Sequence, residues 1–129
     1  MRTTKILSLF VFLLLLAACG GGGDTAGAPV ASPTPSGDAA AGEVLFQQSC
    51  ASCHGPDAKG VAGLGKDMTT SDFIQGLSDE ELLAFVKTGR STSDPLNTTG
   101  VDMPPKGGNP ALTDAQLLDI IAFIHSVQE

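Results

Sequence analysis

Cys50-Ala51-Ser52-Cys53-His54 is the stretch of this 129-residue chain that decides its fold. Two residues separate the cysteines, so both thiols lie on the same side of a single helical turn. Thiols in this spacing can add across the two vinyl groups of a porphyrin and form thioether bonds. The adjacent histidine can then supply an imidazole nitrogen to the iron as proximal ligand. The pentapeptide therefore predicts covalent attachment of one haem through Cys50, Cys53 and His54.

A cysteine pair of this spacing has other interpretations. It can be a thiol–disulfide redox pair with a thiol pKa lowered at a helix end, although the chain lacks the alternating strands and helices expected around that motif. It can also form a local disulfide, or half of a zinc site completed by His54 and His125. Directly adjacent Cys53 and His54 do not fit the usual spacing of zinc ligands. The histidine that follows the second cysteine favours haem.

The first 18 residues have the pattern of a lipoprotein signal peptide. Arg2 and Lys5 precede an apolar run over 6–16, which is too short to span a bilayer stably as a mature helix. The following Leu16-Ala17-Ala18-Cys19 resembles the lipobox of bacterial lipoproteins, which implies cleavage after Ala18 and lipidation of Cys19. The alternative is an ordinary cleavage site with a chance cysteine nearby.

Residues 19–37 are rich in Gly, Ala, Pro, Ser and Thr and show no apolar periodicity. We therefore expect a flexible tether, which would reach about 60 Å when fully extended. With lipid on Cys19, the domain over 38–129 would be exported to the periplasmic or extracytoplasmic face and anchored to the membrane. This assignment leaves no cysteine for a structural disulfide.

Charge limits the range of partners. Loss of residues 1–18 would remove two of the seven basic residues and none of the fourteen acidic ones, changing the formal charge from −7 to −9. An acidic surface argues against nucleic acid, and against electrostatic adhesion to anionic lipid, so the acyl chains must provide the anchor. It fits redox partners with a basic docking face, or merely keeps an exported monomer soluble.

Helical signals are spread over 38–129. Asp38 is a predicted N-cap for a helix over 39–49, and a short helix is expected within 67–75. Ser78 and Thr113 each open a capping-box pattern, which predicts a helix ending before Gly89 and a last helix reaching about Val127. The expected inward-facing residues are Val44, Leu45, Phe46, Leu82, Leu83, Phe85, Val86, Leu117, Ile120, Ile121 and Ile124.

No segment alternates like a strand, so the predicted fold is all-α, with three to four helices wrapped around one covalently bound haem c. About 92 residues make a marginal core on protein alone, and the macrocycle would add apolar mass. The sixth iron ligand is expected to be Met103, which two following prolines present from a stiff loop. Met68, His125 and an open site are the alternatives.

The motif over 50–55, the capped helices and Met103-Pro104-Pro105 together resemble a class I (mono-haem) cytochrome c domain over about 38–127. The resemblance implies that the first and last helices cross at Gly42, where Ile120 or Phe123 approaches. Family members often have a proline whose carbonyl accepts the other N–H of the proximal histidine. Here Gly63-Leu64-Gly65 occupies that neighbourhood, which leaves the acceptor open.

We therefore expect a one-electron carrier between respiratory or photosynthetic partners, not an enzyme, because His54 and Met103 would fill both axial positions of the iron. A second hypothesis is a haem protein with an open sixth site that binds a small gas or peroxide. The third hypothesis is the haem-free thiol–disulfide oxidoreductase described above.

Overall fold

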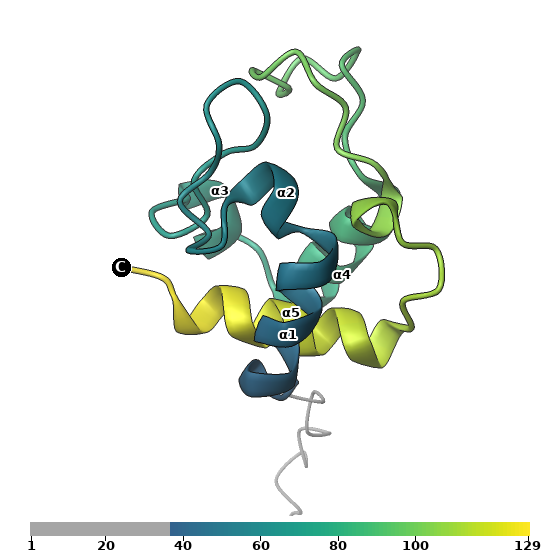
Figure 1. Cartoon of the computed structure of the whole chain (residues 1–129). Helices are drawn as coiled ribbons and strands as arrows, with labels where there is room; N and C mark the ends of the chain where they lie inside the picture. Colours follow the sequence, from purple (N-terminus) through teal and green to yellow (C-terminus); the bar gives the residue numbers. More distant parts are fainter. Residues whose placement is uncertain (1–36) are drawn as a thin grey trace, which may run out of the picture. The chain divides into compact units, whose positions relative to one another are not determined.

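The computed structural model describes residues 37–129 (Figure 1). The predicted signal peptide over 1–18, lipidation of Cys19 and all of the predicted tether except Gly37 lie outside the described residues. The elements, in chain order, are α1 (Ala39–Ser49), α2 (Ala51–His54), α3 (Asp72–Gln75), α4 (Asp79–Thr88), the 3₁₀ turn η1 (Pro105–Gly108) and α5 (Asp114–Ser126). Residues 37–129 contain two isolated β-bridges and no strand, so the all-α prediction is confirmed.

Local side-chain chemistry sets where the three longer helices begin. The Asp38 carboxylate accepts hydrogen bonds from the N–H groups of Ala40 and Ala41 at the start of α1. Complete capping boxes open α4, through Ser78 and Glu81, and α5, through Thr113 and Gln116. Each box satisfies backbone donors that a helix start otherwise leaves free. These predicted starts are confirmed.

Helix α1 crosses α5 at very short range (Figure 1). A Cβ atom placed on Gly42 would lie 1.9 Å from the carbonyl oxygen of Asp119, so only glycine permits this approach. One turn further along α1, the Phe46 ring packs on the Phe123 ring with centroids 5.1 Å apart. The expected crossing at Gly42 is confirmed, and its closest partner is the backbone of Asp119.

One detail of the predicted core was wrong, and one predicted helix is shorter than expected. Val44 is 57 % exposed, because the crossing uses Gly42 and Phe46 and a residue midway between them faces away from α5. The short helix expected within 67–75 is present as α3, which covers only the last four of those residues. It starts late because the Asp67 carboxylate accepts hydrogen bonds from the N–H and hydroxyl of Thr69, which fixes a turn before the helix.

The core lies between α5 and α4, next to the end of α1. Its fully or nearly buried side chains on these helices are Phe46, Leu82, Val86, Leu117, Ile120, Ile121, Phe123 and Ile124. Leu45, Leu83 and Phe85 are half-buried at its margin. Among residues 37–129, no helix is both long and apolar enough to cross a membrane.

Candidate haem site

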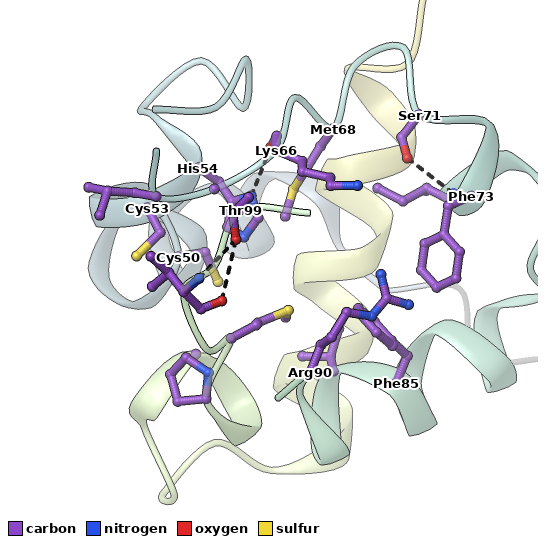
Figure 2. Close-up of a pocket in the computed structure, with 18 of the residues that line it drawn as sticks. Cys50, Cys53, His54, Lys66, Met68, Ser71, Phe73, Phe85, Arg90 and Thr99 are labelled. Carbon is purple, nitrogen blue, oxygen red and sulfur yellow. Dashed lines mark hydrogen bonds between the residues drawn. The ribbon is translucent and has the colours of Figure 1, made fainter. Parts of the chain in front are cut away.

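The junction of α1 and α2 positions the cysteine pair. Cys50 ends α1, with its N–H donating to the Phe46 carbonyl at 2.8 Å, and the chain turns directly into α2. The N–H of His54 donates to the Cys50 carbonyl at 3.0 Å, so the histidine follows the cysteines on one compact turn. Figure 2 shows Cys50, Cys53 and His54 together on one side of a cavity, and no disulfide joins the two cysteines.

A backbone carbonyl orients the imidazole of His54. Its Nδ1 lies 2.9 Å from the carbonyl oxygen of Lys66, so Nδ1–H donates and Nε2 is left as the nitrogen that can bind iron. The approach depends on Gly65, where a Cβ atom would lie 2.3 Å from the carbonyl oxygen of Cys53. The acceptor that the sequence left open is therefore the Lys66 carbonyl, within a loop that needs no proline.

Met103 is fixed by a two-hydrogen-bond bridge to Arg90. The Met103 N–H donates to the Arg90 carbonyl at 2.8 Å, and the Arg90 N–H donates to the Met103 carbonyl at 2.9 Å. Gly89, which ends α4 as predicted, allows this contact, because a Cβ atom there would lie 2.2 Å from the Met103 carbonyl oxygen. The backbone of Met103 is thus held from the end of α4, and Pro104 follows directly.

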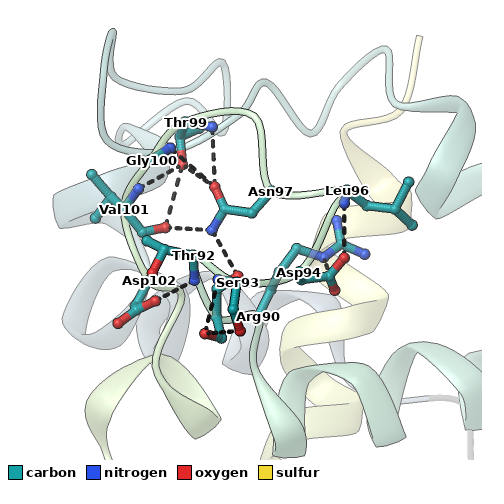
Figure 3. Close-up of polar contacts among 11 residues, drawn as sticks. Arg90, Thr92, Ser93, Asp94, Leu96, Asn97, Thr99, Gly100, Val101 and Asp102 are labelled. Carbon is teal, nitrogen blue, oxygen red and sulfur yellow. Dashed lines mark hydrogen bonds and ion pairs between the residues drawn. The ribbon is translucent and has the colours of Figure 1, made fainter.

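The loop over 91–102 carries its own hydrogen-bond network, centred on Asn97 (Figure 3). The amide of Asn97 donates to the carbonyl of Val101 at 2.8 Å, and its side-chain oxygen accepts from the N–H groups of Thr99 and Gly100. The Asp102 carboxylate accepts from the N–H of Thr92 and joins the two ends of the loop. These bonds give the segment before Met103 a defined shape without secondary structure.

All four predicted site residues line one cavity of about 240 Å³. Apolar side chains make up much of the wall, among them Met68, Ile74, Leu82, Val86 and Ile120. A dry wall of this kind suits a hydrophobic macrocycle and lowers the dielectric around a metal. Two free thiols and an oriented imidazole are the side chains that attach a covalently bound haem, and the Met103 thioether in the same cavity is available as a further iron ligand.

The structure argues against the thiol redox pair and the zinc site as alternative interpretations of the cysteine pair. Burial and the neighbouring Cys53 raise the pKa of the Cys50 thiol to about 11, the opposite of the lowered value that a redox pair needs. His125 is exposed on α5 and its Nε2 lies 3.0 Å from the Asp79 carboxylate, away from the cysteines. Within the described part of the chain, no three His, Cys, Asp or Glu side chains gather as metal ligands, so the zinc interpretation is wrong.

Met68 remains close to the site. It is 8 % exposed, belongs to the buried core and also lines the cavity. Its carbonyl accepts a 2.6 Å hydrogen bond from the Gln128 side chain, so the end of the chain holds it in place. Packing and the backbone contact account for its position, as expected of a residue in a locally packed segment.

Comparison with known proteins identifies the family. A family model described as cytochrome c matches residues 39–128. Cytochrome c-555 of Chlorobaculum thiosulfatiphilum is 35 % identical over 88 residues, which are 67 % of this chain and 93 % of that protein. The chain belongs to the cytochrome c family, and its cofactor is haem c, covalently bound and containing iron.

Other similarities are to segments of larger proteins. The cbb3-type cytochrome c oxidase subunit CcoP of Rhodobacter capsulatus is 32 % identical over 90 residues, or 69 % of this chain, which spans only 29 % of that subunit. The solved structure of cytochrome cL from Methylophaga aminisulfidivorans matches with a TM-score of 0.52 and 27 % identity, covering 69 % of this chain and 52 % of that one. The family match makes the protein a c-type cytochrome.

Sequence reasoning missed two functional neighbours of the site, the Lys66 carbonyl and Arg90. Every residue has a backbone carbonyl, so the sequence does not indicate which carbonyl accepts the hydrogen bond from His54. Arg90 did leave a signal, since it directly follows the glycine that ends α4 and is one of only two arginines in the chain.

Proposed function

We propose that Cys50 and Cys53 would hold the haem through thioether bonds, and that His54 and Met103 would bind its iron. The observation that carries this proposal is the placement of both ligand side chains in one apolar cavity, each tied to a separate backbone anchor. When bound, the haem supplies a single electron by the change between ferric and ferrous iron.

Residues of the chain would then set the reduction potential of the iron. The Lys66 carbonyl increases the electron donation of the His54 ring, and the soft thioether of Met103 favours ferrous iron relative to a second histidine. Since both axial positions would be filled by side chains, no position is left for a substrate. We therefore infer a carrier and not a catalyst.

The rim of the cavity supports transfer to protein partners. Leu64 is 43 % exposed and Leu96 is 60 % exposed, and both border the cavity. Exposed apolar side chains at the rim of a cofactor cavity would allow a small, transient contact with a partner protein. With the acidic charge of the chain, they favour respiratory or photosynthetic redox partners that present a basic face. The lipid anchor at Cys19 would keep this exchange at the extracytoplasmic face of the membrane.

Ligation by Met103 can be tested in the haem-loaded protein with Met103→Ala, using Met68→Leu as the matched control. Met68→Leu removes the sulfur of the other methionine in the cavity and keeps a similar volume. We expect Met103→Ala to abolish the sulfur-to-iron charge-transfer band, to allow carbon monoxide to bind rapidly, and to lower the potential by on the order of 0.2 V. A band that survives Met103→Ala, or that disappears in Met68→Leu, would show that Met103 is not the ligand.

A further inference from the structure

Arg90 has an unusual environment for a basic residue. Its guanidinium carbon lies 4.7 Å from the ring centroids of both Phe73, on α3, and Phe85, on α4. The two rings contact each other edge to face at 5.0 Å, and the Arg90 side chain is only 15 % exposed. Cation–π contact holds the guanidinium in a fixed position that water barely reaches.

This buried cation lacks a well-placed acceptor. The Nε atom of Arg90 is buried without a hydrogen-bond partner among residues 37–129. The Asp94 carboxylate forms an ion pair with Arg90 at 3.3 Å from Nε (Figure 3). This contact does not have the geometry of a hydrogen bond. Nε is thus a buried donor whose hydrogen bond is unmade although the charge is paired, and an anion on the cavity side would satisfy it.

The position of Arg90 in the cavity indicates which part of a bound haem would supply that anion. Arg90 lines the same cavity as the cysteines, and Figure 2 shows it on the side away from Cys50 and Cys53. In haem the two propionate carboxylates project from the edge of the macrocycle opposite the vinyl groups. Since the cysteines would hold the vinyl edge, the carboxylates would point toward the Arg90 side.

The other basic residues of the described chain reinforce this choice. Lys59 and Lys87 pair with acidic side chains, and Lys106 donates to the carbonyls of Pro110 and Leu112. Lys66 also lines the cavity and has no ion-pair partner within 37–129. Among the described basic side chains, Arg90 and Lys66 are the two that line the cavity, and neither donates a hydrogen bond to an acidic side chain within 37–129.

We propose that Arg90 binds a haem propionate through Nε and its terminal N–H groups, with Phe73 and Phe85 fixing the plane of the guanidinium. Because the backbone of the same residue bridges Met103, Arg90 joins a carboxylate at the haem edge to the loop that presents the axial ligand. This inference rests on the haem c cofactor and is independent of which partners exchange electrons with the protein.

The test uses the full chain matured with haem, with Arg90→Gln, Arg90→Lys and the control Lys87→Gln. Lys87→Gln removes the same charge from an exposed surface pair outside the cavity. The equilibrium constant for reduction by a one-electron mediator is measured for each. Loss of the cation leaves the propionate charge uncompensated, which favours ferric iron, so Arg90→Gln should lower the constant about tenfold, equivalent to about 59 mV. Lys87→Gln should change it less than about threefold, since exposed charges are screened.

A second measurement identifies the acceptor directly. In ¹⁵N-arginine-labelled wild-type protein, the Nε–H of Arg90 should exchange slowly and show nuclear Overhauser contacts to the propionate methylene protons. These contacts should persist in Asp94→Asn. Equal effects of Arg90→Gln and Lys87→Gln on the mediator equilibrium would refute the proposal, as would an Nε–H signal that depends on Asp94 and lacks propionate contacts. If Arg90→Gln fails to retain haem, the proposal is tested by the mediator equilibrium of Arg90→Lys and by the propionate contacts in the wild-type spectrum.

Discussion

Gly42→Ala tests the physical basis of the fold at its tightest point. The new Cβ would lie 1.9 Å from the carbonyl oxygen and 2.4 Å from the carbonyl carbon of Asp119. Ordinary contacts between heavy atoms are about 3.5 Å, so α1 and α5 would have to separate by more than about 1 Å. Overpacking costs about 1–3 kcal/mol, and a backbone obstacle places this site at the upper end of that range. Alanine stabilises a helix by about 1 kcal/mol relative to glycine. We therefore expect the free energy of unfolding to fall by about 2 kcal/mol net.

The assay is guanidinium unfolding of the haem-loaded protein, followed by circular dichroism of the helices. With a slope of about 3 kcal/mol per molar, the midpoint should fall by about 0.7 M. Gly76→Ala is the matched control, because its φ is −83° and the nearest atom to a new Cβ is the Asp72 carbonyl oxygen at 3.2 Å. If Gly42→Ala were as stable as the wild type, or more stable, the close approach of the two helices would not be a constraint on this sequence.

Two further substitutions test the histidine anchor and the membrane tether. In Gly65→Ala the new Cβ would lie 3.1 Å from Nδ1 of His54 and closer still to backbone, so the loop must shift and the carbonyl hydrogen bond should weaken. We expect the potential to rise by several tens of mV, on the order of a tenfold equilibrium change, because the imidazole donates less to ferric iron; an unchanged or lower potential would contradict this. Cys19→Ser should move the protein from the membrane to the soluble fraction with an unchanged haem spectrum, and a variant that stays with the membrane would argue against lipidation.

Local chemistry explains why the sequence predicted the helices well. The Asp38 cap and the capping boxes at Ser78 and Thr113 depend only on residues within three positions, and the structure contains all of them. Val44 was assigned to the wrong side of its helix because the direction of a helix face depends on its partner. That partner is the backbone of Asp119, which is 77 positions beyond Gly42 in the sequence.

The sequence by itself determined the chemistry of this protein: a cysteine pair with an adjacent histidine, a methionine before two prolines, capped helices and no strands. These features reside in residue types at fixed spacing, so they can be read without a fold. Only the tertiary structure decided which groups surround that chemistry. The hydrogen bond from His54 to the Lys66 carbonyl, the bridge between Arg90 and Met103, and the contact of the Arg90 guanidinium with Phe73 each join residues more than ten positions apart in the chain. Such contacts are created by packing, which brings together backbone and side-chain groups that no local pattern records.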